Sequence, residues 1–399
     1  MKQPIFFPIL FFSLFIAFTS CSDDNDDPNL YVPIAVSYPN VEAAFGDKLN
    51  LNALNNYANQ AIPAYITKDN SILNRISDKG ATLGRVLFYD KNLSSNNTIS
   101  CSSCHNQANA FGDTNVASTG INGTTGRHSM RLINTRFAVE SKFFWDERAA
   151  SLEIQTTMPI KDHGEMGFSG TNGDQDFSGL TTKLGNIGYY KELFEFVYGS
   201  EEVTENKIQL ALAQFIRSIQ SFDSKYDFGR VLAPNNNAPF ANYTAQENQG
   251  KNLFNQPPVF DANSNRTGGG VGCAGCHAAP EFDIDPNSRN NGIIGTIAGV
   301  GIDITNTRAP SLRDLVKTNG TTNGSMMHTG VISSLQAAIG HYGTINIAPG
   351  NTNLDPRLRP NGIGQKLNLN ATEVDALIAF LRTLSGTNVY VDTKWSTPF

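Results

Sequence analysis

Charged side chains are few in this 399-residue chain, and lysines and arginines do not cluster in it. Only 17% of the residues are charged, and the formal net charge is -6. Proteins that bind nucleic acids concentrate basic side chains where they follow the phosphates, so we expect no nucleic-acid partner. The low charge and the 35 glycines are typical of an extracytoplasmic protein with long loops.

An apolar run occurs at the N-terminus, where residues 1–20 read MKQPIFFPILFFSLFIAFTS. This pattern is typical of an export signal, and the run is too short to favour a membrane-spanning helix. Cys21 follows directly, and small residues before a cysteine resemble a bacterial lipoprotein cleavage site. We therefore expect a periplasmic protein anchored to a membrane through lipidated Cys21, with a flexible tether over residues 21–60. An ordinary signal peptide with an unrelated cysteine is the alternative.

Cysteine is rare as well, and its placement is informative. Of the five cysteines, one is Cys21, and the other four form two C-x-x-C-H units at 101–105 and 273–277. Three kinds of site use such cysteine pairs: a redox dithiol, a zinc site and a covalently attached haem c. A redox dithiol does not need a histidine directly after its second cysteine. A structural zinc site usually draws its cysteines from units that lie much closer together in the chain.

Haem c attachment accounts for every residue of both units. Two thioether bonds fix the porphyrin, and the adjacent histidine ligates the iron. Bacterial haem attachment takes place outside the cytoplasm, which agrees with the export signal. We therefore predict two covalent haems c. The expected thioether cysteines are Cys101, Cys104, Cys273 and Cys276, and the expected iron ligands are His105 and His277.

Helical patterns dominate the rest of the chain, whereas strand patterns are scarce. Residues 208–219 carry an apolar stripe behind a candidate cap at Thr204, and a capping box at Asn370 precedes a second stripe over 374–381. These stripes are expected to face the core. The stretch 231–243 is rich in proline and asparagine and lacks periodicity, which is typical of a domain boundary.

We therefore predict a mainly α fold with two cytochrome c-like haem domains in tandem and long loops. The two domains are expected over residues 61–235 and 236–386, and a C-terminal tail over 387–399.

Four longer segments resemble a known family. The segments Gly84–His105, Phe143–Gly167, Arg308–Asp314 and Met326–Gly343 look like the bacterial dihaem cytochrome c peroxidases and the related MauG-type dihaem enzymes. Several motifs of this length together are far more specific than any one of them alone. Their order and approximate spacing are similar to the family over residues 77–384.

The resemblance implies a peroxidatic haem in the N-terminal domain, with His105 as its proximal ligand. The distal pocket of the family uses a glutamine, a proline and a glutamate, which match Gln155, Pro159 and Glu165. A carboxyl group beside the haem, with its pKa raised by an apolar wall, is suited to take a proton from peroxide and to return it. Glu165 and Gln155 are therefore the implied catalytic residues.

The resemblance also implies a route for electrons. Trp145 matches the tryptophan that relays electrons between the two haems, although core packing is the alternative role for a tryptophan. Arg148 is suited to pair with a haem propionate, because the guanidinium fork matches a carboxylate. The second haem, with His277 as its proximal ligand, is implied to transfer electrons from a cytochrome c or a cupredoxin. A homodimer is a further expectation from the family.

The distal loop of the N-terminal haem departs from the best-known peroxidases. Those enzymes carry a removable ligand histidine there, whereas the corresponding position in STGINGTTGRHS falls near Ile121. His128 comes later in the same loop and is expected to be a loop or inter-haem polar residue. The sequence therefore predicts an N-terminal haem iron that is open at rest and needs no reductive activation.

The second haem departs from those peroxidases at its distal ligand. Where they place a methionine, this chain has Tyr342, as MauG-type enzymes do, and the adjacent His341 is a competing ligand. A phenolate favours ferric iron and lowers the reduction potential. The inter-haem calcium site of the family falls on His128, Asn323 and Ser325. Histidine is a poor ligand for a hard cation, so a calcium ion stays an open alternative.

The function that these expectations imply is that of a cytochrome-c peroxidase, which reduces hydrogen peroxide to water with electrons from a small periplasmic redox protein. Two alternatives remain at this stage. One is a MauG-like oxidase that acts on a protein or another organic substrate, and the other is a dihaem electron carrier without catalytic activity.

Overall fold

The structure is a computed structural model that describes residues 36–138, 142–284 and 286–399. The predicted signal, Cys21 and the first part of the predicted tether lie outside these residues. The fold described below is the compact unit over residues 38–399. Among the described helices, none combines the length and the apolar character needed to cross a membrane.

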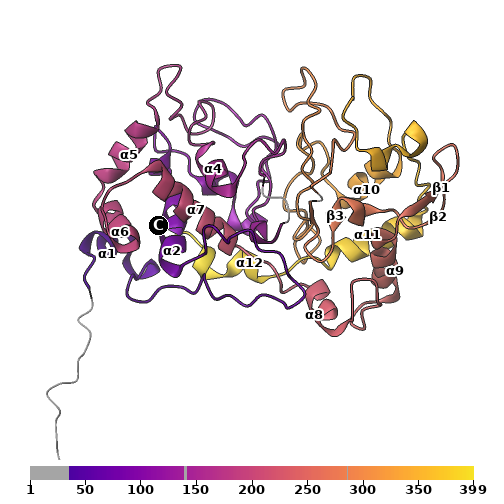
Figure 1. Cartoon of the computed structure of the whole chain (residues 1–399), viewed down its shortest axis with the longest axis horizontal. Coiled ribbons are helices and arrows are strands. Elements are labelled where there is room, and N and C mark those ends of the chain that lie inside the picture. The colour runs from indigo at the N-terminus through magenta and orange to yellow at the C-terminus, as the bar shows by residue number, and fades with distance from the viewer. Residues whose placement is uncertain (1–35, 139–141, 285) are drawn as a thin grey trace, which may run out of the picture. The chain divides into compact units, whose positions relative to one another are not determined.

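The first half of the fold is a group of helices around one hydrophobic core (Figure 1). Its helices are α1 (Pro39–Phe45), α2 (Asp78–Tyr89), α3 (Cys101–Cys104), α4 (Leu152–Thr157), α5 (Phe177–Gly185), α6 (Gly188–Tyr198) and α7 (Glu205–Ser218). Helix α2 packs tightly on α7, because Gly84 brings the two backbones together. A Cβ atom on Gly84 would lie 2.0 Å from the carbonyl oxygen of Ala211.

The second half repeats this packing around a separate core. Its helices are α8 (Lys225–Leu232), α9 (Ala245–Asn255), α10 (Leu335–Gly343) and α11 (Ala371–Arg382). Helix α9 meets α11 through Gly250, whose added Cβ would lie 1.8 Å from the carbonyl oxygen of Ala376. A glycine therefore allows the close helix contact in both halves.

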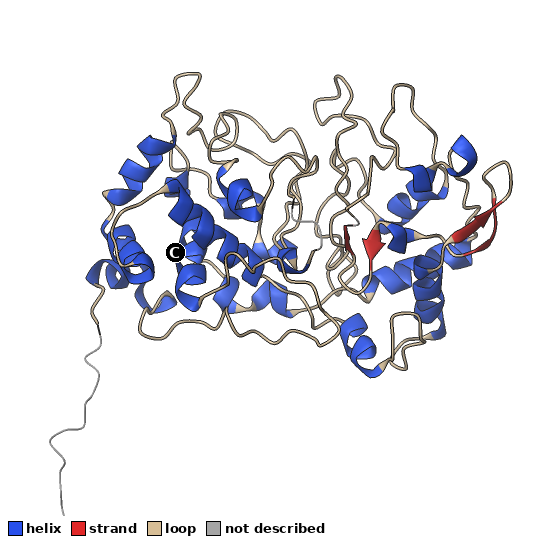
Figure 2. Ribbon diagram, in the orientation of Figure 1, coloured by secondary structure: helices blue, strands red, loops and turns tan. Residues whose placement is uncertain are grey.

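Strands contribute little to the described fold (Figure 2). Strands β1 (Pro258–Phe260) and β2 (Arg266–Gly269) form one antiparallel pair, and β3 (His277–Ala278) and β4 (Asp283–Ile284) form another. Short 3-10 turns occupy Gly46–Lys48, Lys91–Leu93, Gln107–Asn109, Thr135–Phe137, Cys273–Gly275, Pro356–Leu358, Pro360–Gly362 and Thr393–Trp395. Long loops connect these elements, so the predicted mainly α character is confirmed.

Both predicted helix starts are confirmed. The Thr204 side chain caps α7 by accepting a hydrogen bond from the Lys207 N–H (3.2 Å), and the apolar stripe that follows is buried. Asn370 and Glu373 form the capping box of α11. Strong local signals therefore agree with the tertiary fold at both positions.

Residues 39–60, which the sequence analysis assigned to the tether, are packed against the first core. Val41, Phe45 and Tyr57 are buried. The Glu192 carboxylate on α6 accepts hydrogen bonds from the Asn40 and Val41 N–H groups (3.0 and 2.9 Å). The apolar side chains of this segment thus gain burial from distant partners that no local pattern shows.

The boundary between the two cores lies before the stretch 231–243, where the sequence predicts a domain boundary. The first core includes Ile219, whereas Tyr226 on α8 already belongs to the second core. The reason is aromatic packing, since the Tyr226 ring lies 5.4 Å from the Phe240 ring and 4.8 Å from the Phe282 ring. Helix α8 therefore packs with the second half.

The last described segment returns to the first half. Helix α12 (Asn388–Val391), drawn in yellow in Figure 1, and the turn after it place Val389 and Trp395 in the first core. The Trp395 indole donates to the Ser218 hydroxyl (3.2 Å). We name residues 387–396 the C-terminal strap. They fall within the range that the sequence analysis assigned to a tail, 387–399.

Candidate functional site

The residues predicted for the peroxidatic site line one cavity. His105, Gln155, Pro159 and Glu165 face the same space of about 460 Å³, and Trp145 forms part of its wall. Cofactor pockets typically have volumes of about 300–1,000 Å³. The fold therefore brings together side chains from α3, α4 and the loops that follow them.

His105 follows α3 and is oriented by a tight turn. Its Nδ1 donates to the Phe111 carbonyl (3.1 Å), which leaves the other ring nitrogen, Nε2, as an acceptor. Ala110 and Phe111 both have left-handed backbones, with φ of 54° and 57°. Such conformations are costly for residues other than glycine, and they persist here at two residues that are fully buried. This is the arrangement expected for a histidine that ligates a metal through Nε2.

The Cys101 and Cys104 thiols line a smaller adjoining cavity together with His105 and Glu165. Neither thiol is in a disulfide, and the same holds for Cys273 and Cys276. Burial raises the pKa of Cys101 to about 12 and that of Cys104 to about 11. Burial raises the pKa of the Cys273 thiol in the same way.

Glu165 is held by a turn that begins at Asp162. The Asp162 carboxylate accepts hydrogen bonds from the Gly164 and Glu165 N–H groups (2.8 and 3.0 Å). Burial raises the pKa of the Glu165 carboxyl to about 7, and the Asp162 charge adds to this, whereas Arg148 opposes it. A carboxyl group with this pKa gains and loses a proton readily near neutral pH. Asp162 lines the same cavity, although no sequence motif predicted a role for it.

The loop near Ile121 is bonded to the Glu165 turn. The Ile121 N–H donates to the Glu165 carbonyl (3.0 Å), and the Asn122 N–H donates to the Gly164 carbonyl (3.1 Å). His128 lines the cavity too, but its Nδ1 is occupied by the Val116 carbonyl (3.1 Å), and the side chain is buried. The distal loop therefore supports Glu165.

Trp145 lies in the wall of three cavities, two of which contain His277. Its indole N–H donates to the His128 carbonyl (2.7 Å), and its own carbonyl accepts from the Thr307 and Arg308 N–H groups (2.8 and 3.0 Å). The side chain is buried. Trp145 is thus rigidly held between the two C-x-x-C-H units.

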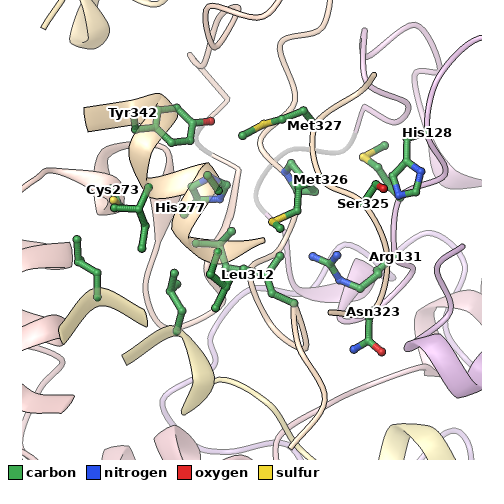
Figure 3. Close-up of a pocket in the computed structure, with 18 of the residues that line it drawn as sticks. His128, Arg131, Cys273, His277, Leu312, Asn323, Ser325, Met326, Met327 and Tyr342 are labelled. Atoms are coloured by element: carbon green, nitrogen blue, oxygen red, sulfur yellow. The ribbon is translucent and has the colours of Figure 1, made fainter. Parts of the chain in front are cut away.

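The second unit has a cavity of about 530 Å³ lined by Cys273, Cys276, His277, Tyr342 and Trp145. The His277 Nδ1 is buried and has no hydrogen-bond partner within the described residues. Burial raises the pKa of the Tyr342 hydroxyl. Figure 3 shows Tyr342 and His277 beside one another in the adjoining apolar pocket.

His341 points to a different partner. Its Nε2 donates to the Asn291 carbonyl (2.9 Å), so this nitrogen is occupied, whereas the Tyr342 side chain faces the cavity. Met326 and Met327 line the adjoining apolar pocket, and Met327 accepts a contact from the Asn291 amide (3.1 Å). Tyr342 is thus the better-placed candidate of the two predicted distal ligands.

Arg148 reaches the first cavity but is already paired. It contacts the Asp146 carboxylate (2.8 Å) and stacks on the Phe144 ring at 3.6 Å. Arg127, Arg131 and Arg308 line the same cavity and were missed. Arg308 belongs to the RAPSLRD motif, which was the one available signal for these arginines.

The predicted calcium ligands gather in the apolar pocket of Figure 3. His128, Asn323 and Ser325 all line it. The Asn323 amide donates to the Asp314 carbonyl and the Tyr390 hydroxyl (2.8 and 2.7 Å), and its Oδ1 has no partner within the described residues. In those same ranges, no group of three or more His, Cys, Asp or Glu side chains converges as a metal site. Calcium binding stays a prediction.

The residues present fit two haem groups. Each C-x-x-C-H unit opens on a cavity of cofactor size, carries two cysteines outside any disulfide and offers a half-buried imidazole. His105 would hold one iron and His277 the other, each with its pair of cysteines.

Comparisons with known proteins agree with this fit. Residues 78–233 match the family model of the di-haem cytochrome c peroxidases. The chain is 27% identical to the methylamine utilization protein MauG of Methylophilus methylotrophus, over 78% of this chain and 84% of that protein. It is also 27% identical to the cytochrome c551 peroxidase of Nitrosomonas europaea, over 77% of this chain and 80% of that protein.

A solved structure is similar as well. The crystal structure of a MauG-like protein associated with microbial copper homeostasis superposes with a TM-score of 0.65 at 27% identity, covering 85% of this chain and 99% of that one. Sequence, site and fold thus agree: residues 78–233 match the di-haem cytochrome c peroxidase family model, and most of the chain is similar to MauG and cytochrome c peroxidase proteins.

Proposed function

We propose that this protein is a cytochrome-c peroxidase, which reduces hydrogen peroxide to water with electrons from a cytochrome c or a cupredoxin. The observation that carries the proposal is the shared cavity of His105, Gln155 and Glu165, with Trp145 between it and the second unit. Export, lipidation of Cys21 and covalent haem attachment are parts of the same proposal. Bound haem supplies the iron centres at which peroxide and electrons react.

Glu165 and Gln155 act on the bound peroxide. The Glu165 carboxylate takes the proton from one peroxide oxygen and returns it to the other as the O–O bond breaks, and this second oxygen leaves as water. Two electrons from the donor and two further protons reduce the remaining oxygen to a second water. The Glu165 pKa of about 7 suits both transfers of the peroxide proton. The Gln155 amide orients the peroxide by hydrogen bonding, and the Ile121 loop holds the Glu165 backbone so that the carboxylate needs no rearrangement.

Trp145 provides the connection between the two halves. It lines the cavities on both sides, and three hydrogen bonds fix its backbone carbonyl and indole. An aromatic side chain held in one position is suited to relay electrons from the His277 unit to the His105 unit.

A second candidate function is that of a MauG-like oxidase, which oxidises a protein or another organic substrate. Two observations favour it. The loop at Ile121 carries no ligand histidine, and Tyr342, not methionine, faces the second cavity. Both features suit an enzyme that holds oxidising equivalents at a low reduction potential.

The decisive experiment is peroxide consumption by the fully oxidised holoprotein, with reduced cytochrome c as donor. We expect turnover without prior reduction, and Glu165→Gln should abolish most of it. Glu195→Gln is the matched control, since Glu195 is exposed on α6. Peroxide-dependent oxidation of an organic substrate, with cytochrome c left reduced, would instead establish the second candidate. If the ferric spectra of the holoprotein do not change on addition of peroxide or cyanide, the protein is an electron carrier.

A further inference from the structure

The turn that follows His105 is fastened to the C-terminal strap. Gln107 lies two residues after His105, and its side-chain amide donates to the Val389 and Asp392 carbonyls (3.3 and 3.0 Å). These carbonyls belong to the end of α12, where helix carbonyls lack intrahelical partners. One glutamine therefore satisfies two strap acceptors and fixes the start of the turn.

Backbone hydrogen bonds connect Gln107 to the His105 ring through the turn. The Ala110 N–H donates to the Gln107 carbonyl (3.0 Å), and the Phe111 N–H donates to the Asn106 carbonyl (2.9 Å). The Phe111 carbonyl then accepts from His105 Nδ1 (3.1 Å). Because Ala110 and Phe111 are both left-handed, the turn keeps this form only with support from its surroundings.

The same strap is bonded to the second half through Tyr390. The Tyr390 hydroxyl donates to the Asp314 carboxylate (3.2 Å) and accepts from the Asn323 amide (2.7 Å). Asp314 and Asn323 are buried, and Asn323 lines the apolar pocket that also contains His277. Figure 3 shows Asn323 in this pocket, next to Arg131.

The strap is also fixed along its length. At its start, the Asp223 carboxylate accepts from the Thr387 N–H and hydroxyl (both 2.8 Å). Towards its end, the Tyr57 and Tyr89 hydroxyls donate to the Lys394 and Trp395 carbonyls (both 2.6 Å). A displacement at Tyr390 is therefore not absorbed by a loose segment.

We propose that the C-terminal strap positions the imidazole of His105 through Gln107, and that it ties this orientation to the second half through Tyr390. Gln107 and Tyr390 are positioning residues, since neither lines the cavity of His105. The hydrogen bond on the second nitrogen of a ligating histidine sets the ring orientation and the basicity of the ligand. The inference rests on haem ligation by His105, which is part of the proposed function, but it does not require peroxide turnover.

The test uses the ferric holoprotein and reads electron paramagnetic resonance and the reduction potential of each haem. Gln107→Glu has the same shape but no amide donors, and its carboxylate repels the strap carbonyls. We expect it to shift the signal and the potential of the His105 haem and to leave those of the His277 haem unchanged. Gln107→Lys restores a donor for both carbonyls, and it should return the signal towards that of the wild type.

Gln220→Glu is the matched control, because the Gln220 amide also donates to a backbone carbonyl, that of Ala61 (2.9 Å), which belongs neither to the turn after His105 nor to the strap. It should leave both haem signals unchanged. Wild-type signals and potentials in folded Gln107→Glu would overturn the positioning role.

Tyr390→Phe tests the connection even if Gln107→Glu does not fold, since it removes only a hydroxyl. We expect a shift of the His105 haem signal, and an unchanged signal would overturn the connection. A protein with these shifts but without peroxide turnover would contradict the proposed function and leave this inference standing.

Discussion

The indole N–H of Trp145 donates a 2.7 Å hydrogen bond to the carbonyl oxygen of His128. This bond holds a buried tryptophan at the boundary between the two cavities. We expect Trp145→Phe to lower peroxide turnover at least tenfold while peroxide binding to the oxidised protein stays unchanged, because the relay loses its position. Stopped-flow kinetics with reduced cytochrome c would measure both steps.

Tyr243→Phe is the control for this variant. Tyr243 is also a buried aromatic residue whose polar group is hydrogen-bonded, to the Thr383 hydroxyl (2.5 Å), but it lines neither cavity. It should lower the free energy of unfolding by about 1 kcal/mol through the lost hydrogen bond and leave electron transfer intact. Equal losses of turnover in both variants would contradict the relay.

The Glu165 carboxyl predicts a pH dependence. Its pKa is raised to about 7, first by burial and then by Asp162, and the proton acceptor is the ionised form. Peroxide turnover should therefore rise with pH and reach half its maximum near pH 7, and Glu165→Gln should remove this dependence along with about 100- to 10,000-fold of the rate. A pH profile of kcat/KM checks both.

The raised pKa of Glu165 also makes the free energy of unfolding depend on pH. Whereas turnover rises with pH, this free energy falls. Because the folded state holds the Glu165 proton up to about pH 7 and the unfolded chain releases it near 4.5, stability falls as pH rises through this interval. Glu165→Gln should flatten that fall. Denaturant unfolding at pH 5 and pH 8 measures it, and an identical fall in the variant would show that Glu165 does not titrate as described.

The two glycine contacts between helices give a matched pair of stability predictions. Gly84→Ala and Gly250→Ala place a methyl group against a backbone carbonyl, and each should cost about 1–3 kcal/mol of unfolding free energy through overpacking. Gly340→Ala on α10 is the control, since an added Cβ there meets nothing within 4 Å. It should stabilise the protein by about 0.4–1 kcal/mol by restricting the unfolded chain.

The residue at position 342 should set the reduction potential of the His277 haem. Tyr342→Met should raise the reduction potential of the His277 haem, because a thioether favours ferrous iron more than a phenolate does. His341→Ala should leave the potential unchanged, since the His341 ring is occupied by Asn291. Spectroelectrochemical titration distinguishes the two, and a shift only in His341→Ala would assign the ligand to His341.

Arg313 and Asp227 form a fully buried ion pair between the RAPSLRD motif and α8, with contacts of 2.9 and 3.0 Å. Arg313→Met should cost about 3–5 kcal/mol, because the Asp227 charge is left buried without its partner. The double variant with Asp227→Asn should recover part of this loss. Thermal and denaturant unfolding measure both.

Acid should weaken the same pair. Burial alone would raise the pKa of Asp227, but Arg313, with Ser224 and Tyr65, brings it below its ordinary value of 3.8. Its contribution to stability is therefore complete above about pH 4 and is lost as the pH falls below that value.

Helices with a cap and a long apolar stripe were predictable from the sequence, as α7 and α11 show. The distal side chains Gln155, Pro159 and Glu165 were predictable only through the family motifs, because nothing in their local pattern places them beside His105. Local patterns report periodicity, whereas a loop-built site depends on long-range contacts.

The strap and residues 39–60 are two segments whose packing no sequence pattern predicts. Neither has a sustained apolar period, yet Val41 and Trp395 are buried by partners far away in the chain. Arg131 and Asp162 were missed for the same reason, since an isolated charged residue in a loop carries no signal of the cavity that it lines.

The return of the strap also orders the folding of the chain. The core that surrounds the first C-x-x-C-H unit receives Val389 and Trp395 from the last stretch of the sequence. That core stays incomplete until the whole second half has been synthesised, so its assembly is not sequential along the chain. The proposed covalent attachment of haem at Cys101 and Cys104 would fall in this interval, before the N-terminal half closes.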